Sequence, residues 1–261
     1  MASYTQQYAR NLRYAVWGGI FLIGFTIMVN AMQRRKETLV SGIIVDITPI
    51  ENGSFLIDES DIPALLEERF AQPLESLPVG KVNVERLERV LEEDPFVKQA
   101  EAWVDAQSRV HIAIEQRMPL LRVIDNNGLN YYLDKEGSNM PPSRHFAARV
   151  RVATGNLPPW EERFLRDTGS VLTHVYRLNE LLMADEFLDA LIEQIYVNKR
   201  GELILSPKIG KQTIQFGRYQ DAEAKLERLK TFYREGLPYK GWKAYRSFDL
   251  RYNGQVVCVK R

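Results

Sequence analysis

The sequence predicts an α+β protein in which one apolar helix near the amino terminus precedes two folded regions. Three observations support this prediction. Residues 15–32 form an uncharged apolar run, and residues 40–116 follow a strand–helix–helix–strand–strand pattern. After Pro119, short strand-like runs alternate with turns and helical segments. A small sheet with two helices on one side, followed by a larger β region, makes an α+β fold.

The run from Ala15 to Met32 is long enough to cross a bilayer. Roughly 18 residues at about 1.5 Å each give about 27 Å of helix, close to the thickness of a hydrocarbon core. Basic residues flank the run: Arg10 and Arg13 precede it, and Arg34, Arg35 and Lys36 follow it. We therefore predict an uncleaved transmembrane anchor, with residues 1–14 as a small tail on one side and most of the chain on the other.

Three other interpretations of this run are open. A cleaved signal peptide fits the small residues around Ala31, but a basic cluster directly after the run is unfavourable for export. A buried core helix is disfavoured, because the run is apolar on all faces and lies at a terminus. An anchor of the opposite orientation also remains, since the basic residues on the two sides do not decide the orientation.

The first folded region has five predicted elements. Residues 40–50 are rich in β-branched residues and predict a strand. Two helices follow, over residues 58–70 and 83–93, and each begins at a residue that can cap it. Residues 97–104 and 109–115 then predict two strands, and the second alternates apolar with polar side chains.

The second region predicts a mixture of strands and helices. The expected strands are 121–124, 129–133, 150–152, 195–197, 202–206, 212–216, 247–252 and 255–260. The expected helices are 161–183, a short one beginning at 187, and 221–233, which Asp221 is expected to cap. The last two strands flank Asn253-Gly254, so the chain closes in a hairpin or a bulged strand.

Charge gives no support for nucleic-acid binding, and the cysteine count excludes a disulfide within the chain. The chain has 261 residues and a formal net charge of +1, which gives no electrostatic argument for nucleic-acid binding. Cys258 is the only cysteine, so no disulfide can form within the chain.

The sequence also lacks a recognisable catalytic set. His111, His145 and His174 lie far apart without the spacing of metal ligands. Cys258 alternates with Val256, as a small strand residue does. No serine stands in a G-x-S-x-G motif. We therefore expect no enzymatic activity, no catalytic residues, no metal and no cofactor.

Four motifs, taken in order, resemble the FtsQ/DivIB family of bacterial cell-division proteins. They are Asp94–Ala100 with Glu115–Pro119, Leu133–Gly137 with Pro141-Pro142, Phe216-Gly217-Arg218, and Phe248–Gly254. The order of the motifs, together with one span, matches the whole family architecture. The resemblance implies a cytoplasmic tail over residues 1–14, a transmembrane helix over 15–32, a POTRA domain (β-α-α-β-β) over 38–118, and a mixed β domain with flanking helices over 119–261.

The resemblance also implies a function. Members of this family are non-enzymatic, bitopic proteins of the inner (plasma) membrane at the division septum. Their amino terminus is cytoplasmic and both folded domains are periplasmic. The implied partners are FtsB and FtsL-like bitopic proteins and other divisome proteins, and no nucleic acid is implied.

The family places its FtsB site at the edge of the β domain near the final strand. Matching positions implicate Arg251 and Tyr252, then the strand residues Gln255, Val257 and Val259. On the preceding helix, Phe232 and Tyr233 are expected to flank the same patch. A terminal strand can lie at a sheet edge with unpaired backbone groups, where a partner adds its own strand.

These site residues also have a structural interpretation. Arg251 can simply pair with Asp249 or Glu202, and a tyrosine near a strand end is commonly half buried.

Two other functions compete with the division scaffold. One is a POTRA-bearing chaperone or translocation component that binds unfolded polypeptide by strand addition. Proteins of that class usually contain several POTRA repeats and a β-barrel. This chain has one such unit and no series of about ten membrane-facing strands. The other is a membrane-tethered cell-wall hydrolase, which the missing catalytic set disfavours.

Overall fold

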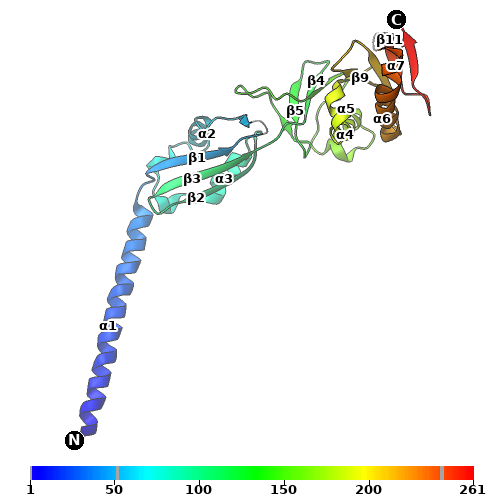
Figure 1. Ribbon diagram of the computed structural model, residues 1–261. Helices are drawn as coiled ribbons and strands as arrows, with labels where there is room; N and C mark the ends of the chain where they lie inside the picture. The colour runs from blue at the N-terminus through cyan, green and yellow to red at the C-terminus, as the bar shows by residue number, and fades with distance from the viewer. Residues whose placement is uncertain (1, 51–52, 242–243) are drawn as a thin grey trace. The chain divides into compact units, whose positions relative to one another are not determined.

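The computed structural model describes residues 2–50, 53–241 and 244–261, apart from the side chains of residues 2–16, 18 and 240. The chain divides into two compact units, residues 1–49 with 57–116 and residues 50–56 with 117–261. Figure 1 shows the elements of each unit along the chain.

Helix α1 spans Ala2–Glu37 and includes the predicted span. Among the residues described with their side chains, no helix is both long and apolar enough to cross a membrane. The side chains of residues 15, 16 and 18, which belong to the predicted span, lie outside the described set.

The first unit has the predicted strand–helix–helix–strand–strand order. Its elements are β1 (Gly42–Thr48), α2 (Asp61–Phe70), the short 3-10 helices η2 (Leu74–Ser76) and η3 (Val79–Lys81), α3 (Val84–Glu92), β2 (Val97–Val104) and β3 (Arg109–Gln116). The sheet order is β1-β3-β2, with β3 parallel to β1 and antiparallel to β2. Asn83 caps α3, because its side chain accepts the backbone N–H of Arg86 at 2.9 Å.

The core of the first unit lies between its helices and one face of its sheet. Leu66, Leu87 and Leu91 come from the helices, and Val110, Ile112 and Ile114 come from alternate positions of β3. The opposite face of the sheet is open to solvent.

Side chains of α3 protect the outer edge of β2. The backbone N–H groups of Ala100 and Ala102 donate to carboxylate oxygens of Glu92 and Glu88, at 3.3 and 2.8 Å. An edge strand whose outward donors are already paired is a poor acceptor for a further strand.

The second unit is a mixed sheet with helices packed against it, which confirms the predicted α+β class. Its strands are β4 (Leu121–Asp125), β5 (Asn130–Leu133), β6 (Asn139–Met140), β7 (Arg151–Gly155), β8 (Ile192–Val197), β9 (Leu203–Pro207), β10 (Thr213–Gly217), β11 (Tyr245–Asp249) and β12 (Val257–Lys260). Its helices are η4 (Phe164–Arg166), α4 (Val171–Met183), α5 (Glu186–Leu191), α6 (Ala222–Thr231), the π-helical turn η5 (Phe232–Gly236) and α7 (Leu237–Lys240). Among the described residues, the strand order is β12-β11-β10-β9-β8-β7-β4-β5-β6.

Two helical predictions are wrong in their boundaries. The helix expected over 161–183 begins only at Val171, because Arg163 has a left-handed φ of 70° and a turn follows at Thr168-Gly169. Asp221 makes no capping hydrogen bond, because its own backbone is left-handed at φ 49°. The last long helix ends at Thr231 and continues as the π-helical turn.

Gly155 allows β7 and β8 to approach closely at their carboxyl ends. Its φ is 103°, and a Cβ at this position would lie 2.2 Å from the carbonyl oxygen of Val197. We expect Gly155→Ala to lower the free energy of unfolding by about 2–5 kcal/mol. The alanine would have to adopt a positive φ, and its Cβ would crowd the carbonyl oxygen of Val197. Urea denaturation followed by circular dichroism measures this change.

Gly128→Ala is the matched control for this prediction. Gly128 also has a positive φ, 84°, but no atom lies within 4 Å of a Cβ there. Only the backbone penalty of about 1–2 kcal/mol should remain. Equal losses in the two variants would show that the contact with Val197 is not the constraint.

Candidate partner-binding edge

Strand β12 is an edge strand. It pairs antiparallel with β11 and stands at one end of the strand order of the second unit. In Figure 1 it is the red arrow that carries the carboxyl terminus. In the described part of the chain it has no second strand neighbour, so one side of its backbone is available for pairing.

Every second residue of β12 directs its backbone N–H to this open side. The N–H of Arg261 donates to the carbonyl oxygen of Ala244, at 3.2 Å, on the β11 side. The bulge of this strand pair lies in β11, so the alternation along β12 is unbroken. The N–H of Val257 therefore faces β11, whereas those of Cys258 and Lys260 face outward.

The side chains of β12 divide between two faces. Val256 and Cys258 pack against the core of the second unit. Val257 and Val259 are 36% and 37% exposed on the opposite face, and Gln255 is exposed before the strand begins. An added strand would therefore extend an apolar row on the outer face.

Arg251 and Tyr252 lie in the connection between β11 and β12 rather than in a strand. Arg251 Nη2 contacts Asp249 Oδ2 at 2.7 Å, and Nη1 lies 3.8 Å from Glu202 Oε1. The hydrogen bond from Arg251 lowers the pKa of Asp249, and the same contact raises the pKa of Arg251. Arg251 thus makes the structural pairs expected of it, while Tyr252 is 52% exposed.

Phe232 and Tyr233 lie beneath β11. Their ring centroids are 5.0 and 5.7 Å from that of Phe248, a fully buried residue of β11. Tyr233 is only 2% exposed, so its side chain lies in the core of the second unit. Phe232 is partly buried against the same core. Both rings support the strand on which β12 rests.

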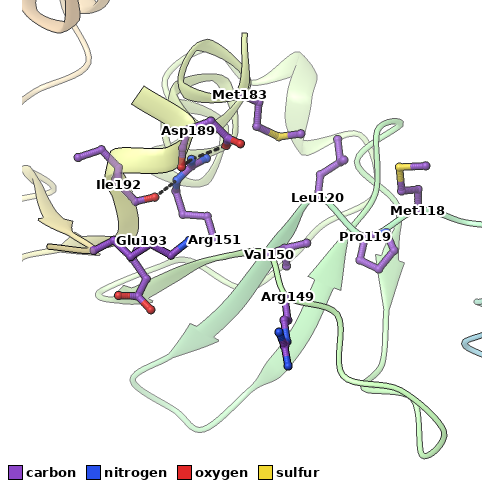
Figure 2. Close-up of a pocket in the computed structure, with 11 residues that line it drawn as sticks. Met118, Pro119, Leu120, Arg149, Val150, Arg151, Met183, Asp189, Ile192 and Glu193 are labelled. Atoms are coloured by element: carbon purple, nitrogen blue, oxygen red, sulfur yellow. Dashed lines mark hydrogen bonds and ion pairs between the residues drawn. The ribbon is translucent and has the colours of Figure 1, made fainter. Parts of the chain in front are cut away.

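A pocket of about 570 Å³ lies at the amino ends of β4, β7 and β8. Figure 2 shows Arg151 between Asp189 and Ile192 on one side of it, with Met183, Leu120 and Met118 on the other. The pocket is lined by Met118, Pro119, Leu120, Arg149, Val150, Arg151, Met183, Asp189, Ile192, Glu193 and Lys208.

The buried guanidinium of Arg151 has a structural role. Its Nε donates to the carbonyl oxygen of Ile192 at 2.9 Å, its Nη2 to Asp189 Oδ1 at 2.8 Å, and its Nη1 to Asn179 Oδ1. Desolvation lowers the pKa of Arg151, and Asp189 opposes this shift. The side chain ties β7 to α4, α5 and β8. Sequence reasoning missed it, because nothing near Val150-Arg151-Val152 marks the arginine as buried.

Metal-binding geometry is also lacking in the part of the chain that the structure describes. No group of three or more His, Cys, Asp and Glu side chains there is arranged to hold an ion.

Comparisons with known proteins support the resemblance. A family model described as FtsQ/DivIB, C-terminal related, matches residues 118–259, and a POTRA-like domain model matches residues 41–115. Cell division protein FtsQ of Rhodothermus marinus is 29% identical over 173 residues, which cover 59% of this chain. The match spans about 60% of the length of that relative. Since the first family model covers more than half of the chain and extends from β4 into β12, the chain belongs to the FtsQ/DivIB family of cell-division proteins.

Proposed function

We propose that this protein is a non-enzymatic, single-pass scaffold at the division septum, which recruits FtsB and FtsL by accepting a strand at the open edge of β12. The observation behind the proposal is the set of outward N–H groups on a strand with one neighbour. Main-chain hydrogen bonds would supply affinity, and side chains at the same edge would supply selectivity.

Two other sheet edges are weaker candidates. β6, at the far end of the same sheet, is only two residues long. The N–H groups at the edge of β2 in the first unit are paired with Glu88 and Glu92. β12 has four residues and two exposed valines, so it offers a longer and more apolar edge than β6. β1 (Gly42–Thr48), the other edge strand of the first unit, is longer still, and the choice of β12 rests on its place in the domain that the FtsQ/DivIB model matches.

The proposal includes a membrane anchor over residues 15–32, with the amino terminus in the cytoplasm and both units in the periplasm. Support comes from four consecutive residues of α1, Ile20 to Ile23, whose side chains are all exposed. Because four consecutive helical residues cover every side of a helix, this segment is apolar all round. A helix of this kind is stable in hydrocarbon rather than in water.

The orientation can be tested with a reporter that is active only outside the cytoplasm. Fused after Arg261, it should be active, and the mature protein should retain residues 15–32. The expected cause is insertion of the uncharged run with the longer part of the chain translocated. A silent reporter would contradict this orientation, and a mature protein that begins at Met32 would contradict the uncleaved anchor. Reporter activity in cells and amino-terminal sequencing measure the two results.

Tyr252 tests the side-chain part of the proposed FtsB site. We expect Tyr252→Ala to weaken binding of an FtsB peptide about 30-fold, the effect of losing about 2 kcal/mol at an aromatic hot spot. Fluorescence anisotropy with the full-length protein measures the dissociation constant.

Tyr196→Ala is the control for Tyr252→Ala. Tyr196 is 40% exposed and lies on β8, four strands from β12 in the sheet. It should bind like the parent protein. If Tyr252→Ala also stays folded and binds like the parent, Tyr252 makes no important contact with FtsB.

Cys258 tests the main-chain part of the site. Cys258→Pro removes an N–H that faces the open edge, so we expect binding of the same peptide to weaken about 10-fold or more. Cys258→Ala keeps the N–H and should bind like the parent. Val257→Pro should instead impair folding, because it removes a donor to β11. A folded Cys258→Pro protein with parental affinity would rule out strand addition at β12.

A further inference from the structure

The open face of the sheet in the first unit carries an apolar row at one end. The strand register aligns Ile44 of β1, His111 of β3 and Trp103 of β2. Ile44 is 39% exposed and Trp103 is 48% exposed. The next rows of the same face are mostly polar and contain Asp46, Ala113 and Glu101, then Thr48, Glu115 and Gln99. Apolar exposure on this face is therefore concentrated at one end.

Trp103 is held in a fixed orientation at the surface. Its ring stacks on His111 with the centroids 5.2 Å apart and the planes 8° from parallel. His111 Nε2 lies 2.9 Å from Asp105 Oδ2, and Arg109 Nε donates to the same oxygen at 2.7 Å. An exposed aromatic side chain fixed in this way is suited to contact a surface outside the chain.

The end of the sheet that carries this row is joined to the end of α1. Arg35 Nη2 donates to the carbonyl oxygen of Asp105 at 3.1 Å. The backbone N–H of Ser41 donates to the carbonyl oxygen of Ser108 at 2.9 Å. Arg35 follows Met32, the last residue of the proposed anchor, by about 4.5 Å of helix rise. The headgroup region extends about 5–8 Å beyond each side of the hydrocarbon core. The turn at Asp105 would therefore lie at the depth of the lipid headgroups.

Basic side chains surround the same end. The last turn of α1 carries Arg34, Arg35 and Lys36, and β3 begins with Arg109. The acidic residues there are Glu37, the last residue of α1, and Asp105, which is paired with Arg109. Trp103 and a net excess of cations have the composition of a membrane-interface contact.

We propose that Trp103, Ile44 and the adjacent basic residues form a lipid-contact surface that rests the first unit on the anionic membrane beside α1. The inference depends on the proposed anchor, because the end of the anchor sets the depth of the turn at Asp105 in the membrane. Bound in this way, the first unit would keep a defined orientation at the membrane instead of pivoting on α1.

Fluorescence quenching in lipid nanodiscs tests this contact with the full-length chain. In a Cys258→Ser background, single labels are placed by Gln107→Cys in the turn after β2, by Thr48→Cys at the polar end of the same face, and by Phe21→Cys in the proposed span. Lipids with a nitroxide on the headgroup should quench the Gln107 label but not the Thr48 label. Lipids with a nitroxide on the acyl chain should quench the Phe21 label.

Substitution of the aromatic residue gives the second part of the test. Trp103→Ala should reduce headgroup quenching of the Gln107 label about two-fold or more, since the aromatic anchor is lost. Discs without anionic lipid should have a similar effect. Gln99→Ala, on the same strand but in the polar rows, should leave the quenching unchanged.

The outcomes separate this inference from the anchor on which it depends. A quenched Phe21 label with an unquenched Gln107 label, or with no effect of Trp103→Ala, overturns the lipid contact and leaves the anchor intact. An unquenched Phe21 label refutes the anchor and the lipid contact together. If the Gln107 label is shielded only after another division protein is added, the row belongs to a protein interface and the lipid assignment is wrong.

Discussion

The pairing of β10 with β11 supports the carboxyl-terminal end of the large sheet. These parallel strands share three paired positions, and the N–H of Leu250 adds a hydrogen bond to the carbonyl oxygen of Gln215 at 2.9 Å. So short a pairing needs support from packing. Phe248 supplies it, because its ring is fully buried against Phe232, Tyr233 and Tyr245. Since β11 is the only strand neighbour of β12 in the described part of the chain, the open edge depends on this aromatic cluster.

The edge strands β2, β6 and β12 differ in how much of their outer backbone is available for pairing. Glu88 and Glu92 pair with the outward N–H groups of β2, and β6 is too short to offer a ladder. Unpaired edges promote aggregation, so the open backbone of β12, in contrast to the protected edge of β2, offers a specific place for strand addition. The contrast gives the proposed recruitment a physical basis in the backbone, independent of any one side chain.

Much of the fold follows from local sequence signals. Asn83 marks the start of α3, and alternation marks β3, because capping and periodicity act within a few residues. The left-handed backbones at Arg163 and Asp221 have no comparable signal, since glycine is absent from both positions. The family resemblance indicated the final strand as the site, but strand order and the direction of each N–H depend on distant pairing. The helical spacing in the sequence does indicate the burial of Tyr233, because Tyr233 shares a helical face with Leu226 and Leu229.

The pairing of Arg251 with Asp249 affects how genetic data on this region can be interpreted. Asp249 is almost buried, so removing the guanidinium would leave a carboxylate without its main partner inside the protein. A division defect in an Arg251→Ala strain would therefore mix lost recognition with lost stability. Double substitution of Arg251 and Asp249 by a neutral pair would separate the two contributions, as a thermodynamic cycle does.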